Sequence, residues 1–449
     1  VIVSGGTGIF TGLLPFVWFT NQPSNSGLYQ NMVEYNTQKN PGSLPADFGF
    51  NPNYRETLQK YPSLFPSTPS EQAPDVIAYV DPKFKMPQVW RSNLNVDIQL
   101  PYDFMLSVGA MYTRDIYNVA QINMNEAEPT GVYNEQPDRI YWASKKYEYN
   151  DYTNGKNVVV KLSNGEDKGY QYSFNANLTK KYDFGFTGSI GYTYTMAKDL
   201  TANPGSAPNS AWQNNVAVNS LNDPGVSYSL FSTPHRIIAN ASYEINYAKC
   251  LKTTFSLFYS GYHTGRYSYT YYNDMNGDGN YSDLIYVPNS QDEMTFVDIT
   301  DKSGAITYSA VDQAKDFWDF VNNDSYLKDR KGKYVERNGS LTPWINRFDF
   351  KIAQDFYATL GGRKYGIQVS LDMLNVGNMI NSKWGAYQSC GLKSYDNVQL
   401  LKTASKVGEP LTYQINANSR EAFKERSSWQ YTNTIGSAWS MQLGVKVTF

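Results

Sequence analysis

Residues 440–449, SMQLGVKVTF, alternate strictly between polar and apolar side chains. Successive side chains of an extended strand point to opposite faces, so one face of this segment is entirely apolar. That face carries Met441, Leu443, Val445, Val447 and Phe449. The pattern predicts a β-strand that is apolar on one side and polar on the other.

The same alternation recurs through the chain, which predicts ten strands in all. The other nine segments are 1–11, 93–100, 104–117, 170–179, 184–194, 233–246, 252–264, 345–357 and 365–373. Four connections are tight, near 100–103, 180–183, 246–251 and 358–363, whereas five are long, at about 12–89, 118–167, 199–232, 265–344 and 378–436. Short and long connections alternate, as in outer-membrane β-barrels with short periplasmic turns and long extracellular loops. Such strands must pair laterally because lipid offers no hydrogen-bond partners.

Composition supports this fold and excludes others. A net charge of −2 among 449 residues argues against nucleic acid as the main partner. The mean hydropathy of −0.53 does not suit a bundle of membrane helices, and no stretch approaches the roughly 18–20 apolar residues that such a helix needs. The 38 Tyr, 22 Phe and 9 Trp suit many short strands and aromatic bands at membrane interfaces.

Cysteine and histidine are scarce, and this predicts a chain without catalytic activity. Cys250 and Cys390 fall at opposite ends of the predicted strands, so we expect no disulfide between them. Only His235 and His263 are present, and no Ser/His/Asp set, Cys/His pair or phosphate-cradling loop emerges. One loop segment, 311–323, has helical periodicity and is expected to pack with Val311, Ala314, Phe317, Trp318 and Val321 near one face.

Six stretches resemble TonB-dependent outer-membrane receptors of the Bacteroidetes type, most of all the Oar-like receptors, with SusC/RagA proteins as more distant relatives. These stretches are GGTGIFTGLLPFVW (5–18), FKMPQVWRSNL (84–94), NDPGVSYSLFSTPHRI (222–237), GRYSYTYYNDMNGDGNYSDLIYVP (265–288), RKGKYVERNG (330–339) and LDMLNVGN (371–378). The resemblance implies an all-β, transmembrane antiparallel barrel of 22 strands with an N-terminal plug. Residues 1–449 would then be its C-terminal portion, with the plug and N-terminal domain outside this chain.

The resemblance also implies a function: active import of a bulky nutrient, an oligopeptide or a glycan, through the outer membrane. The expected partners are the N-terminal remainder of the receptor, the TonB complex, outer-membrane lipid and a surface lipoprotein. A structural or adhesive surface barrel without transport is the main alternative. A self-closed ten-stranded barrel and a soluble β-rich binding domain or enzyme are further alternatives.

The sharpest local motif is NDMNGDGNYSD, residues 273–283. Oxygen-bearing side chains at alternating positions, followed by Gly279, match the first half of an EF-hand-type calcium loop. Its twelfth position is Ile285 rather than a bidentate Glu, so Asp283 would have to substitute. The candidate Ca²⁺ ligands are Asp274, Asn276, Asp278, Asn280 and Asp283. A turn rich in Asn, Asp and Gly that needs no metal is an equally good interpretation.

Overall fold

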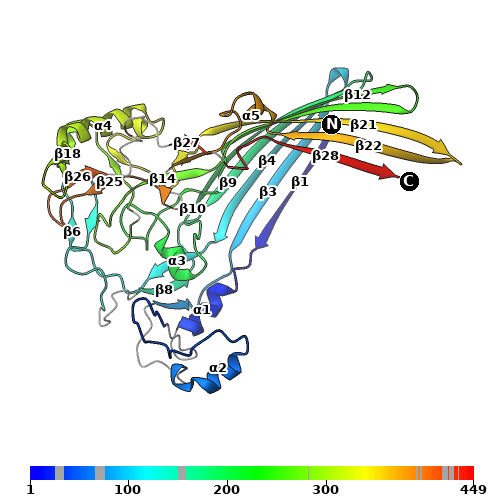
Figure 1. Cartoon of the computed structure of the whole chain (residues 1–449). Coiled ribbons are helices and arrows are strands. Elements are labelled where there is room, and N and C mark those ends of the chain that lie inside the picture. Colours follow the sequence, from blue (N-terminus) through cyan, green and yellow to red (C-terminus); the bar gives the residue numbers. More distant parts are fainter. Residues whose placement is uncertain are drawn as a thin grey trace.

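A curved antiparallel sheet of ten long strands dominates the computed structural model (Figure 1). The structure describes residues 1–25, 35–65, 76–149, 158–281, 283–390, 393–394, 397–416, 423, 429–432 and 434–449. The ten strands pair in chain order, and β11 (Ser227–Tyr228) adds a short pairing to the end of β10. They are β1 (Ile2–Thr11), β3 (Gln88–Gln99), β4 (Phe104–Tyr117), β9 (Tyr170–Lys181), β10 (Phe186–Asp199), β12 (His235–Tyr247), β13 (Leu251–His263), β21 (Trp344–Leu360), β22 (Arg363–Leu374) and β28 (Ser440–Thr448).

These ten strands are the ten that the alternation predicts, so the strand assignment is confirmed. The short connections gather at one end of the sheet and the long ones at the other (Figure 1). The sheet is open: within the described residues β1 and β28 form its two edges and do not pair with each other. The described part of the chain therefore shows neither a closed barrel nor 22 strands.

Strand register separates an apolar face from a polar face. One row of directly opposed residues crosses six strands with apolar side chains only: Phe186, Tyr243, Phe255, Ile352, Leu371 and Leu443. The adjacent row, on the other face, consists of Ser242, Ser256, Lys351, Asp372 and Gln442. Lys351 and Asp372 form an ion pair of 2.8 Å on this polar face. An apolar face toward lipid and a polar face toward a wet lumen is the division that a transmembrane barrel requires.

Aromatic side chains form two bands on the apolar face. The outer aromatic band, toward the long connections, contains Trp90, Tyr112, Tyr172, Phe174, Tyr192, Tyr259 and Phe348. The inner aromatic band, toward the short turns, contains Phe186, Tyr243, Tyr247, Phe255 and Phe356. Aromatic rings are favoured at the two membrane–water interfaces, so these bands mark the expected limits of the hydrocarbon layer.

Three of the short turns use backbone conformations that fit tight hairpins. Gly361 and Gly362, between β21 and β22, both have positive φ, as the two central residues of a type I′ turn require. Gly185 has φ +97°, and a Cβ built there would lie 2.2 Å from the carbonyl oxygen of Glu244. Ala248 reaches a positive φ without being glycine, which costs steric energy in that turn.

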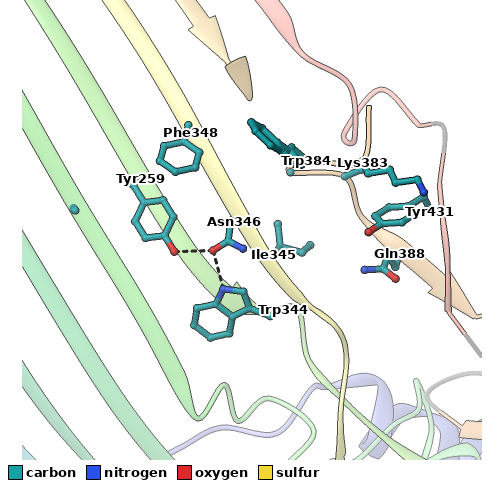
Figure 2. Close-up of a pocket in the computed structure, with 12 residues that line it drawn as sticks. Tyr259, Trp344, Ile345, Asn346, Phe348, Lys383, Trp384, Gln388 and Tyr431 are labelled. Carbon is teal, nitrogen blue, oxygen red and sulfur yellow. Dashed lines mark hydrogen bonds between the residues drawn. The ribbon is translucent and has the colours of Figure 1, made fainter. Parts of the chain in front are cut away.

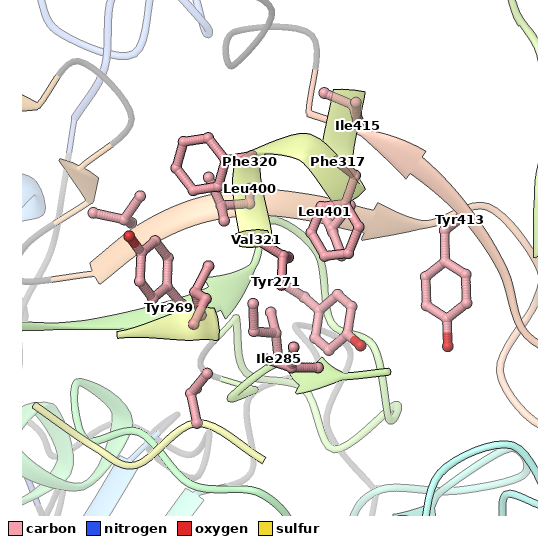
Figure 3. Close-up of a cluster of buried hydrophobic side chains, with 14 of the residues drawn as sticks. Tyr269, Tyr271, Ile285, Phe317, Phe320, Val321, Leu400, Leu401, Tyr413 and Ile415 are labelled. Carbon is pink, nitrogen blue, oxygen red and sulfur yellow. The ribbon is translucent and has the colours of Figure 1, made fainter. Parts of the chain in front are cut away.

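The long connections fold into a second body, here called the loop domain, beyond the end of the sheet (Figure 1). It comprises a six-stranded sheet of β16 (Thr295–Phe296), β26 (Thr412–Ile415), β25 (Asn397–Thr403), β14 (Arg266–Tyr271), β20 (Ser340–Leu341) and β24 (Lys393–Ser394), with helix α4 (Ala310–Asn323) packed against it. Its core gathers side chains from β14, α4, β25 and β26 (Figure 3). Tyr271, Val321 and Ile415 are completely buried in it.

Shorter elements occupy the rest of the connections. No helix in the described part of the chain is both long and apolar enough to cross a membrane. The remaining elements are α1 (Val17–Asn25), α2 (Tyr54–Lys60), η1 (Pro62–Leu64), β2 (Val76–Val80), η2 (Pro101–Asp103), β5 (Ala120–Asn123), β6 (Gly131–Val132), β7 (Ile140–Tyr141), β8 (Val158–Ser163), α3 (Pro208–Gln213), β15 (Tyr286–Val287), η3 (Gln291–Glu293), β17 (Ile299–Thr300), β18 (Ile306–Tyr308), η4 (Leu327–Asp329), β19 (Lys333–Tyr334), α5 (Val376–Ile380), β23 (Gln388–Cys390) and β27 (Trp429–Tyr431).

Helix α4 confirms the helical prediction for 311–323, although its buried face differs. Ser309 caps the helix, since its side chain accepts a hydrogen bond from the backbone N–H of Asp312. Phe317 and Val321 are buried as expected, but Val311 is 76% exposed. Gln313 takes a core position, because its amide donates to the carbonyls of Val297 and Tyr308 and its oxygen accepts from the N–H of Ile415. A fully hydrogen-bonded amide can be buried at little cost, which periodicity alone does not reveal.

Candidate functional site in the loop domain

The predicted calcium motif forms the turn between β14 and β15. Backbone hydrogen bonds hold its two ends together, with the N–H of Tyr271 donating to the carbonyl of Asp283 at 2.9 Å. Gly277 and Gly279 have φ of +84° and +93°, so both glycines allow the chain to reverse where other residues would be strained. The sequence therefore predicts the sharp turn correctly.

Most of the predicted ligands bond to the turn itself. Asp274 accepts from the N–H groups of Gly277 at 2.8 Å and Gly279 at 2.9 Å, one on each carboxylate oxygen. The Asn276 and Asp278 side chains accept from N–H groups two residues on, and Asp283 accepts from the N–H of Met275 at 3.0 Å. Asn276, Asp278, Asn280 and Asp283 are each at least nine-tenths buried. These bonds are the kind that an Asn/Asp/Gly turn makes without metal.

The buried carboxyl groups of Asp278 and Asp283 and the partly buried carboxyl of Asp274 lie in one turn and perturb one another. Burial, followed by the negative charges of Asp283 and Asp274, raises the pKa of Asp278 well above its usual range. Burial also raises the pKa of Asp283 to about 7, although the guanidinium of Arg139 opposes this shift. Burial raises the pKa of Asp274 as well. A divalent cation would relieve this repulsion, so the side chains suit Ca²⁺ chemically.

The same side chains do not form a preorganised metal site. In the described part of the chain, no three His, Cys, Asp or Glu side chains converge closely enough to hold an ion. The oxygens of Asp274 and Asp278 are directed at loop N–H groups instead. Binding of Ca²⁺ at this turn would therefore require the carboxylates to move together.

Arg139 is the electrostatic centre of the loop domain, and no sequence pattern pointed to it. Its side chain is fully buried and lies 3.5 Å from Asp283. It donates further hydrogen bonds to the carbonyls of Val218 and Leu284 and to the side-chain oxygen of Gln136. A buried cation needs such a complete set of hydrogen-bond acceptors. The guanidinium of Arg139 thereby links three of the long connections between barrel strands.

Most of the aromatic stretch 267–272 serves packing within the loop domain. Tyr267, Tyr269 and Tyr271 of β14 are each at most 3% exposed, whereas Tyr272 is 46% exposed. The amide of Gln136 donates to the hydroxyls of Tyr271 and Tyr413, both at 2.9 Å. Their burial supports a role in loop packing for these three tyrosines rather than stacking on a sugar or peptide.

The polar face of the main sheet adds charged groups along the expected lumen. Lys252 lies 3.6 Å from Asp355 and 3.8 Å from Glu244, and these groups are all on the polar face. The two cysteines are not joined to each other: Cys250 is exposed in a short turn and Cys390 is buried in β23. The prediction of no disulfide between them is confirmed.

His235, at the start of β12, hydrogen-bonds the Tyr192 hydroxyl at 2.7 Å within the outer aromatic band.

Comparison with known proteins identifies the family. A family model described as "Outer membrane beta barrel domain" matches residues 1–385. None of the curated proteins matches the chain. The matched residues include nine of the ten long strands completely, all but β28, and they include β14, β16, β20 and α4 of the loop domain. With its alternating faces, its two aromatic bands and this match, the chain belongs to the outer-membrane β-barrel domain family.

Proposed function

We propose that residues 1–449 are the C-terminal barrel portion of a TonB-dependent receptor of the Oar-like, SusC/RagA-related type. Its role would be import of a bulky nutrient, an oligopeptide or a glycan, rather than catalysis. The observation that supports this most is the loop domain, which has its own sheet, helix and buried core at the end of the barrel that faces the medium. An ordered body of this kind can present a fixed capture surface above the lumen.

The open edges of the sheet support the proposed partner, the N-terminal remainder of the same receptor. The outward N–H and C=O groups of β1 and β28 have no strand beside them in the described structure. Unpaired backbone groups cost several kcal/mol each in hydrocarbon. Further strands beside both edges would satisfy these groups in the membrane, and the proposed receptor would supply such strands together with its plug.

Transport and adhesion can be separated in cells that carry the complete receptor. Labelled oligopeptides and, in parallel, a labelled glycan are supplied to cells with and without a functional TonB complex. Uptake of one of them should disappear without TonB, while binding at the surface should persist. Surface binding with no TonB-dependent uptake would instead support the alternative, a structural or adhesive surface barrel.

We further propose Ca²⁺ as a ligand of the 274–283 turn, on the strength of its crowded buried carboxyl groups. Calorimetric titration of the folded chain with CaCl₂ should give binding heat, which Asp278→Asn should abolish. Asp301→Asn is the matched control, because Asp301 makes similar turn hydrogen bonds at an exposed site. Absence of heat at millimolar Ca²⁺ in the unmodified protein would leave the metal-free turn as the explanation. A surface lipoprotein remains a proposed partner, to be sought by copurification with the complete receptor.

A further inference from the structure

A large groove opens at the outer end of the apolar face, and the proposed function does not use it. Its volume is about 820 Å³, within the range of about 300–1,000 Å³ typical of small-molecule sites. Ala239, Tyr259 and Phe348 from three neighbouring strands line one side. Figure 2 shows Trp384 and Tyr431, from the connection between β22 and β28, across from them.

The groove faces the membrane rather than the lumen. Ala239, Tyr259 and Phe348 are directly opposed to one another and share the face of the apolar strand rows. Tyr259 and Phe348 also belong to the outer aromatic band, which in this family lies at the level of the lipid headgroups. A cavity at this position suits a membrane lipid better than an imported nutrient.

The polar groups of two aromatic side chains in the groove already make hydrogen bonds within the protein. The side-chain oxygen of Asn346 accepts from the Tyr259 hydroxyl at 2.8 Å and from the Trp344 indole N–H at 3.0 Å (Figure 2). These bonds hold the rings in place without help from a ligand, so the wall of the groove is preformed.

Lys383 supplies positive charge at the same groove. It is exposed, and it makes no ion pair with any described residue; its ammonium lies 5.8 Å from the centre of the Tyr431 ring. A second groove on the apolar face, of about 290 Å³, is lined by apolar residues, glycine and Asn175, with no basic side chain. Of these two grooves, the larger one combines an apolar floor with a cation at headgroup level.

We infer that the groove binds an acyl chain of a phosphorylated outer-leaflet glycolipid of the lipid A class, with its phosphate beside Lys383. Continuity with the lipid-facing surface accounts for the acyl chain, and charge complementarity accounts for the phosphate. The inference rests on membership of the outer-membrane barrel family and not on the proposed transport. It goes beyond that function, since failure of transport would leave it standing.

The test uses the complete receptor purified in detergent, stripped of lipid and incubated with bisphosphorylated lipid A, with bound lipid counted by native mass spectrometry. Two variants address the site: Ala239→Trp fills the groove, and Lys383→Gln removes the charge. Ala176→Trp, in the smaller groove of the same face, is the matched control. Folding of each variant is checked by its shifted migration in unheated gels.

Ala239→Trp should lower lipid A retention at least 5-fold, and Ala176→Trp should leave it unchanged. Lys383→Gln should lower retention of bisphosphorylated lipid A at least 3-fold without affecting retention of a dephosphorylated form. Equal retention in Lys383→Gln and the unmodified protein would overturn the phosphate contact, even if Ala239→Trp failed to fold. If all three variants retained as much lipid A as the unmodified protein, the bound lipid would be non-specific, and the proposed site would be overturned.

Discussion

Replacement of Arg139 by methionine should loosen the loop domain while leaving the barrel strands intact. The change keeps much of the side-chain volume but leaves Asp283 buried beside no cation and two backbone carbonyls without their donor. Removing one partner of a buried ion pair costs about 3–5 kcal/mol. The pKa of Asp283 is already about 7, so the carboxyl can escape part of this penalty by taking up a proton. We therefore expect the lower value, about 3 kcal/mol.

Amide hydrogen exchange measures this loss directly, since it reports opening of each segment. A loss of about 3 kcal/mol corresponds to roughly 150-fold faster exchange. The effect should appear in β14 and β25, whose strands carry the buried core, and not in β28 of the main sheet. The matched control is Arg330→Met, because the ion pair of Arg330 with Glu336 is partly exposed. That variant should change exchange by less than about fivefold.

A double variant distinguishes the ion pair from simple packing. Asp283→Asn removes the buried negative charge, so it should recover at least half of the stability that Arg139→Met loses. Unchanged exchange of β14 in Arg139→Met would refute the assigned role of the guanidinium. Loss without any recovery in the double variant would show that the arginine acts through its carbonyl contacts and not through Asp283.

Three further outcomes follow from the described structure. Leu443→Arg should reduce membrane assembly by about 2–4 kcal/mol, whereas Gln442→Arg on the polar face should not, as measured by the folded fraction in lipid vesicles. Gly185→Ala should cost about 2 kcal/mol more than Gly225→Ala in thermal unfolding: both glycines have positive φ, but only Gly185 has an oxygen 2.2 Å from the added carbon. The folded-state pKa of Asp283, about 7, exceeds the unfolded value of about 3.9, so the folded loop domain holds the extra proton between these values. The free energy of opening of the loop domain, measured by hydrogen exchange, should therefore fall as pH rises from about 4 to about 7. Asp283→Asn should remove the contribution of one bound proton to this pH dependence.

The main sheet was predictable because every strand obeys one local rule. In a lipid-facing strand, apolar and polar side chains must alternate along the whole length. The apolar positions from Met441 to Val447 therefore pair with apolar positions of the neighbouring strand β22. The turn at Gly277 and Gly279 was predictable for a similar reason, since both positions need the freedom of glycine. Helix α4 was visible through its periodicity, although the buried Gln313 was not.

The loop domain could not be read from the sequence in the same way. All six residues of β14 are buried, so its segment lacks the alternation that marks a half-exposed strand. Its partner β25 lies well over a hundred positions away, at Ser268 opposite Asn397, and no local signal indicates such a pairing. Arg139 was missed for the same reason, because Val218, Asp283 and Leu284, which accept from it or pair with it, lie in distant connections.

The parallel pairing of β14 with β25 also constrains how the protein can mature. The β21–β22 hairpin lies between these strands in the chain, so the sheet of the loop domain cannot form until the chain has passed through that hairpin. Contacts between such remote segments form slowly because a long stretch of chain must be closed into a loop first. The loop domain is therefore expected to be among the last parts of the protein to fold, and to remain sensitive to proteases until its two remote strands have paired.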